Sequence, residues 1–164
     1  MKPTDLLDTL VAFHKDKLTL RQRHSAVARQ VGNYGFNNTY QYVIAREDVH
    51  LSWLEAAIAE LDGTAAAVDE PSLPALGRKA SATPLVSEDA RAAGEFVARW
   101  RPRIAGFTHA RHRGMMDVVL GETLEHQRFF DQIVAGRDDV LGRRANGPKS
   151  PGTGDGVMGV RWIG

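Results

Sequence analysis

The chain contains no cysteine. This absence excludes disulfide bonds, thiolate catalysis, iron–sulfur clusters and metal sites with Cys ligands, so a bound metal would need His, Asp and Glu. No stretch approaches the roughly 20 consecutive apolar residues that a membrane-spanning helix requires. The first 30 residues carry charges throughout, which is unlike a signal peptide. We therefore expect a cytoplasmic protein without a membrane span.

The chain also lacks a charge excess of one sign. Lys and Arg number 21 and Asp and Glu number 20, for a net charge of +1. This balance gives no general attraction to nucleic acid or membrane surfaces. The sequence has no Gly-rich phosphate loop, no nucleophile elbow and no interleaved basic and aromatic face. We expect no nucleic-acid partner.

What the sequence does contain is helical periodicity. At 164 residues with 43% hydrophobic residues, it is long enough for one globular domain. Apolar residues recur at helical spacing in four segments, which span residues 4–31, 38–61, 87–110 and 115–135. We predict an all-α, antiparallel four-helix bundle with a long crossover between helices 2 and 3. The predicted bundle domain covers residues 1–136, and residues 137–164 form a Gly/Pro-rich tail.

Local signals set the expected helix ends. Asn38 with Gln41 resembles a capping box and predicts the start of the second helix. Ser87, followed by two acidic residues, predicts the start of the third. Pro102 predicts a kink or break near Arg101. Residues 108–114 read either as the turn into the fourth helix or as part of one helix over 103–135, and we prefer the turn because it gives helices of matched length.

An acid and a histidine occupy core positions of the second helix. Glu47 and His50 are three residues apart, which puts them on one helical face, and both fall on the apolar stripe. A buried, unpaired carboxylate is costly, so this pair needs partners, a proton or a metal. Glu122 and His126, four residues apart, repeat the pattern on the fourth helix.

The first helix adds two inward polar residues. His24 is expected to face Glu47, either as a metal ligand or as its hydrogen-bond partner. Lys17, on the same stripe, either extends its ammonium to solvent or pairs with a carboxylate. Imidazole and carboxylate donors suit iron, manganese or zinc. The predicted ligands of one such divalent metal are Glu47, His50, Glu122, His126 and His24.

The inward acids and histidines have a second possible role besides metal binding. In a structural or interaction module, the inward acids and histidines would form a hydrogen-bonded polar network instead. His109 and His112 flank the predicted turn and are either further ligands or exposed loop histidines. The third helix offers only an apolar inward stripe, which includes Phe96, Trp100, Ile104 and Phe107.

Over residues 4–136 the chain resembles the ferritin-like (rubrerythrin-like) superfamily: a helical hairpin, a long crossover, a second hairpin, and Glu-x-x-His at Glu47 and His50. Di-iron members place a Glu on helices one and three and Glu-x-x-His on helices two and four. Glu122 and His126 match the fourth-helix motif with a spacing one residue longer. The resemblance implies a metal-binding bundle, and redox or oxygen chemistry if it is catalytic.

A second resemblance is to the DinB/YfiT-like bundles, which hold a divalent metal with three histidines and carry His-Arg-Gly on a late helix. His112, Arg113 and Gly114 are similar to that stretch, and His50 lies where the first ligand would. The usual pair of histidines four residues apart is replaced here by His109 and His112.

The end of the chain suggests partners. A Gly/Pro-rich linker leads to VMGVRWIG at residues 157–164, which is similar to the Gly-spaced apolar tails by which some ferritin-like cargo proteins bind encapsulin shells. The tail is either such a docking peptide or packs on its own bundle or on a dimer mate. We also expect a homo-oligomer.

Overall fold

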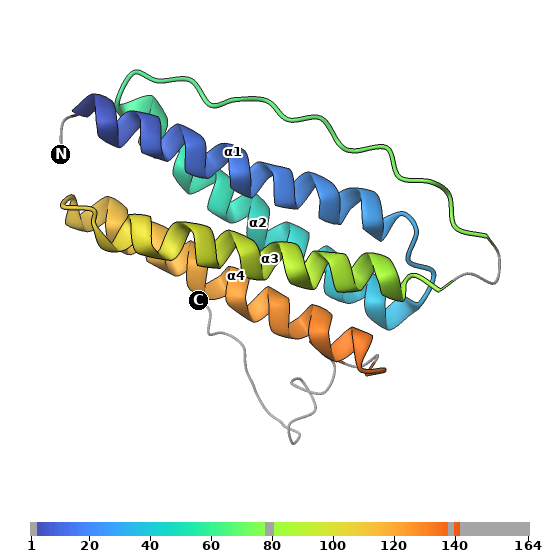
Figure 1. Ribbon diagram of the computed structural model, residues 1–164. Coiled ribbons are helices and arrows are strands. Elements are labelled where there is room, and N and C mark those ends of the chain that lie inside the picture. The colour runs from blue at the N-terminus through green and yellow to red at the C-terminus, as the bar shows by residue number, and fades with distance from the viewer. Residues whose placement is uncertain (1–2, 78–80, 138–139, 142–164) are drawn as a thin grey trace, which may run out of the picture.

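The computed structural model describes residues 3–77, 81–137, 140 and 141, and its described part contains four long helices. They are α1 (Pro3–Ala28), α2 (Tyr34–Glu60), α3 (Thr83–Ala105) and α4 (Ala110–Val134) (Figure 1). The described residues contain no strand, so the predicted all-α class is confirmed. Among these same residues, no helix has the length and apolar character needed to cross a membrane.

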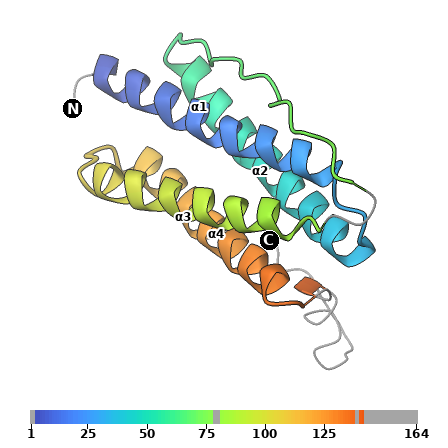
Figure 2. The same ribbon diagram turned by 45° about the vertical axis from the view of Figure 1, so that its right-hand side comes forward.

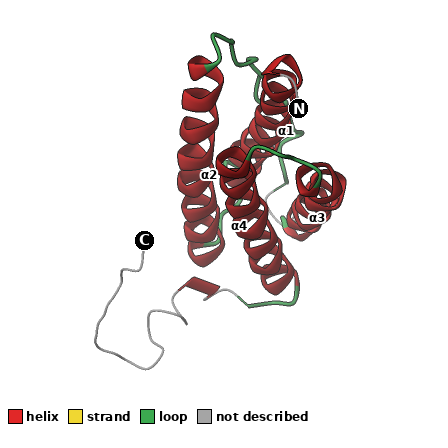
Figure 3. Cartoon of the chain, turned by 90° about the vertical axis from the view of Figure 1, so that its left-hand side faces the viewer, coloured by secondary structure: helices red, strands yellow, loops and turns green. Residues whose placement is uncertain are grey.

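Neighbouring helices run in opposite directions. Between α1 and α2, His24 contacts Glu47 whereas His14 contacts Glu55, so residue numbers rise along one helix as they fall along the other. The pairs Arg46–Glu122 and Glu60–Arg111 show the same reversal between α2 and α4. Figure 3 shows the helices around a shared core, with α2 beside α4 and α1 beside α3.

The connection between α2 and α3 lies along α1 and follows its direction (Figures 1 and 2). Gln22 donates a hydrogen bond to the Val68 carbonyl at 2.7 Å. Eight residues later, in the turn just after α1, the Gln30 side chain accepts one from the Leu76 backbone amide at 3.1 Å. Side-chain bonds from α1 and from the turn after it therefore hold the extended chain that leads towards the start of α3.

The core has an apolar layer at each end and a polar layer between them. The layer near the start of α1 includes Leu10, Phe13, Leu54, Trp100 and Met116. The layer near the α1–α2 turn includes Val27, Tyr40, Val43, Val86 and Phe130. The polar layer is made of buried polar side chains on α1, α2 and α4. They are Lys17, His24, Glu47, His50, Thr123 and His126.

Two helices begin four residues before their predicted starts. Asn33, rather than Asn38, caps α2: its side chain accepts a hydrogen bond from the Phe36 backbone amide at 3.0 Å. α3 begins at Thr83 rather than Ser87, with Pro84 in its first turn. Proline suits this position because the first turn has no use for its missing N–H.

Of the predicted kink or break near Arg101, the break is wrong, because α3 continues through Pro102 to Ala105. The kink stays a prediction. The preferred turn before the fourth helix is confirmed, but it is shorter than residues 108–114, because α4 begins at Ala110. Gly136, with φ of 96°, follows α4 as predicted. The tail at 142–164 lies outside the described residues.

Candidate functional site

A buried ion pair occupies the centre of the polar layer. Lys17 Nζ on α1 lies 3.0 Å from Glu47 Oε2 on α2, and neither side chain is exposed. The ammonium also donates a hydrogen bond to Thr123 Oγ1 on α4 at 2.8 Å. It lies 5.5 Å from the centroid of the Phe96 ring on α3, within the range of a cation–π contact. Lys17 thus contacts residues of the other three helices.

Glu47 has a second partner in His24. The His24 Nδ1–H donates to Glu47 Oε1 at 2.6 Å, so the predicted approach of these two residues is confirmed. Burial by itself would raise the pKa of Glu47, but the neighbouring His24 and Lys17 outweigh it and hold that pKa below its ordinary value. Glu47 is therefore a charged carboxylate in the core, and both of its oxygens face a donor or cation from α1.

A second carboxylate, Glu122 on α4, is held from α2. Arg46 donates two hydrogen bonds to it, at 2.8 and 2.9 Å, and His50 Nε2–H donates a third at 3.1 Å. Burial opposes the charge, but these bonds lower the pKa of Glu122 to about 2. Burial also lowers the pKa of His50, although its bond to Glu122 opposes that shift. At neutral pH, Arg46 thus supplies the positive charge and His50 a neutral hydrogen bond.

His126 is buried at 0% exposure, and neither ring nitrogen has a hydrogen-bond partner among the described residues. Its ring stacks on that of His50, with centroids 6.2 Å apart and an interplanar angle of 20°. Burial, followed by the charge of Lys17, lowers the pKa of His126. His24 Nε2 and His50 Nδ1 also lack partners. The polar layer therefore contains the neutral imidazole of His126 and two further ring nitrogens, of His24 and His50, that make no hydrogen bond.

The five residues predicted to bind one metal thus fall into two groups. Glu47 and His24 form one with Lys17, and Glu122 and His50 form the other with Arg46. His126 lies against His50 without bonding to either group. Within the part of the chain that the structure describes, no set of three or more His, Cys, Asp or Glu is placed to hold a metal ion.

The donors do not fit a metal as they are arranged. Three of the four carboxylate oxygens of Glu47 and Glu122 accept hydrogen bonds from the chain. The fourth, Glu47 Oε2, accepts no hydrogen bond but lies 3.0 Å from the Lys17 ammonium. A metal would have to displace Lys17 from Glu47 or Arg46 from Glu122, or bind through imidazoles alone. The predicted metal site stays a prediction, and no chemical step is derived from it.

Sequence reasoning missed a second buried polar group. Tyr40 OH on α2 donates to Asp89 Oδ2 on α3 at 2.5 Å, and Arg23 Nε on α1 donates to Asp89 Oδ1 at 2.7 Å. Burial, followed by the charge of Asp89, raises the pKa of Tyr40 above its ordinary value. Asp89 reads in sequence as an acid near a helix start, and only the spacing of buried Val86, Ala90 and Ala93 could have shown that it faces inward.

The two histidines near the last turn contact each other. His109 Nδ1 and His112 Nδ1 are 2.8 Å apart, close enough for one ring to donate to the other. His109 is exposed at the N-cap of α4, and His112 is buried within the first turn of that helix. Burial, followed by His109 and Arg111, lowers the pKa of His112. The nearby positive charge of Arg111 disfavours a metal at this pair.

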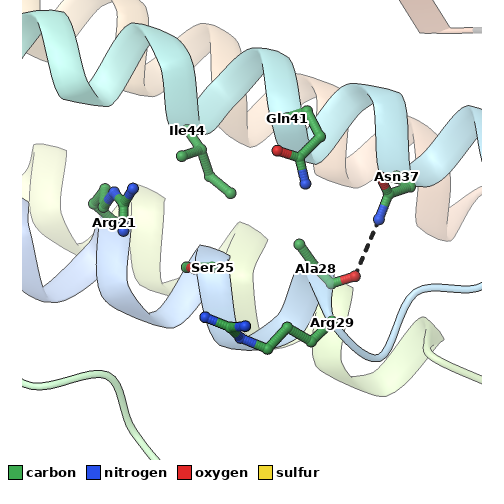
Figure 4. Close-up of a pocket in the computed structure, with 7 residues that line it drawn as sticks. All are labelled: Arg21, Ser25, Ala28, Arg29, Asn37, Gln41 and Ile44. Carbon is green, nitrogen blue, oxygen red and sulfur yellow. Dashed lines mark hydrogen bonds between the residues drawn. The ribbon is translucent and has the colours of Figure 1, made fainter.

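A polar groove of about 340 Å³ lies between α1 and α2 (Figure 4). Its lining includes Arg21 and Arg29, two guanidinium groups that would suit an anion. Each is already paired, Arg21 with Asp48 at 2.9 Å and Arg29 with Glu70 at 2.9 Å. An anionic ligand would compete with these carboxylates, so the groove does not define a site.

The fold and this polar layer define a class: an all-α protein of four helices with a charged, internally paired core. Comparison with known proteins adds no closer assignment, because no family model, no curated protein and no solved structure matches the chain.

Proposed function

We propose that this chain is a non-catalytic structural or interaction module, a helical bundle whose polar core is held by its own ion pairs. One observation carries the proposal: the 3.0 Å contact between Lys17 Nζ and Glu47 Oε2, with both side chains fully buried. The Lys17 ammonium supplies the positive charge that a buried carboxylate needs. Glu47 then requires no bound cation.

Such a network specifies an arrangement of helices more than it adds stability. Removing two charges from water costs several kcal/mol per ion, and their attraction offsets this cost only when the geometry is good. Lys17 meets Glu47 of α2 and Thr123 of α4 at 3.0 and 2.8 Å. A shift of any of these helices by one turn, about 5.4 Å, would leave a buried charge without its partner. In this proposal the core fixes the register of the bundle, which then presents surfaces to partners.

Metal analysis tests the proposal. Protein purified without chelator should contain well under one metal ion per chain, and chelator should leave its unfolding temperature unchanged. A control variant for both measurements is Arg91→Met, which removes an exposed cation whose partners lie on the surface, unlike the buried pair of Lys17 and Glu47. A stoichiometric metal whose removal lowers the unfolding temperature would overturn the proposal.

The second candidate is a metal-binding, ferritin-like protein, degenerate relative to the di-iron members. The unpartnered ring nitrogens of His24, His50 and His126 favour it, because buried polar atoms without partners are costly and suit a ligand. Iron, manganese or zinc would be the ions, and redox or oxygen chemistry the class of any reaction. A metal that used a carboxylate would have to displace Lys17 from Glu47 or Arg46 from Glu122 first. Titration of zinc or manganese into the protein decides: saturable binding lost in a Glu47→Ala, His50→Ala variant would support this candidate.

The prediction of a docking tail concerns residues outside the described structure. We propose the tail as the segment that would contact a protein partner in the cytoplasm, because its linker composition would separate VMGVRWIG from the bundle. Pull-down with the full chain and with a chain lacking residues 147–164 tests this idea. Unchanged partners on truncation would remove it.

A further inference from the structure

The last turns of α3, the connection after it and the first turn of α4 form a strongly basic stretch. Residues 99–113 contain five arginines, two histidines and no Asp or Glu. The arginines are Arg99, Arg101, Arg103, Arg111 and Arg113. This stretch lies at one end of the bundle together with the start of α1 and the end of α2, an end that we call the hairpin end (Figure 1).

Three of these arginines are not neutralised. Arg99 pairs with Asp16 at 3.1 Å and Arg111 with Glu60 at 2.9 Å. Among the described residues, Arg101, Arg103 and Arg113 make no ion pair. Two of the three are positioned by other contacts: the Arg103 guanidinium lies 3.9 Å from the Trp100 ring centroid, and Arg113 Nη1 donates to the Phe107 carbonyl at 3.1 Å.

Three acids at the same end are also unpaired. Asp5 and Asp8 are exposed in the first turns of α1, and Asp62 is exposed just after α2. None of them forms an ion pair within the part of the chain that the structure describes. The contact of the α2 end with the α4 start through Glu60 and Arg111 confirms that these segments adjoin. Unpaired charges of both signs thus share one surface without meeting.

We propose that the hairpin end is a self-complementary docking surface for a second copy of this chain. A twofold axis across the bundle end sets the basic half of each copy over the acidic half of the other, which is an isologous contact. Arg101 and Arg103 of each copy then face the acids of its partner, and the same contact forms twice. A polyanion such as nucleic acid fits less well, because Asp5, Asp8 and Asp62 would repel it.

The size of the surface sets the strength of the contact. Helices of about 10 Å diameter give a four-helix end of roughly 400 Å². Stable interfaces bury about 800 Å² per partner, so this one belongs with weak, transient contacts. Its attraction is electrostatic and exposed, and salt therefore screens it. The dimer is therefore expected to form at high protein concentration and to dissociate as salt rises.

Charge reversal with sedimentation velocity tests the proposal. One variant, Arg101→Glu with Arg103→Glu, gives the basic half an acidic patch, and another, Asp5→Lys with Asp8→Lys, gives the acidic half a basic patch. The control, Lys15→Glu with Arg128→Glu, changes the net charge as the first variant does but at exposed residues elsewhere. Circular dichroism confirms that each variant is folded.

The wild type and the control should dimerise in about 25 mM salt and dissociate in about 500 mM salt. Each end variant alone should be monomeric. An equimolar mixture of the two should recover the dimer, because the reversed halves are complementary between variants. A wild type that stays monomeric at about 1 mM protein, end variants that dimerise as well as the wild type, or a mixture that stays monomeric would each overturn the proposal.

Discussion

Lys17 Nζ and Glu47 Oε2 lie 3.0 Å apart in the interior of the bundle, where neither side chain is exposed to solvent. The contact joins α1 to α2, and Lys17 extends it to α4 through Thr123 Oγ1. A buried pair of this kind is sensitive to the loss of one member, because the charge that remains has neither water nor a counter-ion.

The first prediction concerns this coupling. Lys17→Met and Glu47→Leu should each lower the free energy of unfolding by about 3 kcal/mol or more, since each leaves a buried charge behind. The double variant removes both charges and should lose much less than the sum of the single losses. Urea unfolding of all four proteins measures the coupling energy.

An exposed pair on α3 is the matched control. Arg91 and Glu95, four residues apart and 2.6 Å from each other, are both more than half exposed. Their coupling energy should stay below about 0.5 kcal/mol. If the Lys17–Glu47 cycle gave no larger value than this control, the buried pair would not organise the core.

The second prediction is a loss of stability on mild acidification. Burial lowers the pKa of His126 below its ordinary value of 6.5, so the unfolded chain binds a proton near pH 6 that the folded chain does not. Stability therefore rises with pH up to about 6.5 and falls as pH drops below it. His50 and His112, whose pKa values are also lowered, add to this fall.

His126→Leu should reduce that dependence. The variant removes one of the three histidines whose pKa is lowered, so its unfolding free energy should change less between pH 7 and 5 than that of the wild type. The carboxylate Glu122, with a folded pKa of about 2 against an ordinary 4.5, acts only at lower pH in both proteins. Urea unfolding at several pH values measures the slopes, and parallel slopes would show that His126 titrates alike in both states.

The third prediction concerns the second buried polar group. Tyr40→Phe removes the donor 2.5 Å from Asp89 Oδ2 and leaves that buried carboxylate with Arg23 alone. The free energy of unfolding should fall by about 1–3 kcal/mol. Tyr34→Phe, at a side chain 82% exposed, should change it by less than about 0.5 kcal/mol. Equal effects at the two tyrosines would contradict the role given to Asp89.

Helical periodicity was enough to place the principal polar residues. Glu47, His50, His24, Lys17 and His126 all lie on apolar stripes, and each is buried at 1% exposure or less. The order of helices also followed from the sequence, because turn residues and proline mark where periodicity stops. Helix starts were less certain, since Asn33 and Asn38 are both suitable caps and only the folded turn selects Asn33.

The sequence did not show which buried polar residues contact one another. The inward position of Lys17 was visible, but which carboxylate it meets depends on the axial offset of α1 against α2. The Asp89 contacts join residues 49 and 66 positions apart in sequence, from two different helices. Such pairings are set by helix packing across the core, which the periodicity of one helix does not contain.

The most direct test of the central claim is the metal content of the full-length protein, measured by elemental analysis after purification without chelator. If Lys17 supplies the positive charge for Glu47, the wild type holds well under one metal ion per chain, and chelator leaves its unfolding temperature unchanged. About one iron, manganese or zinc ion per chain, lost in Glu47→Ala with His50→Ala, would contradict this account.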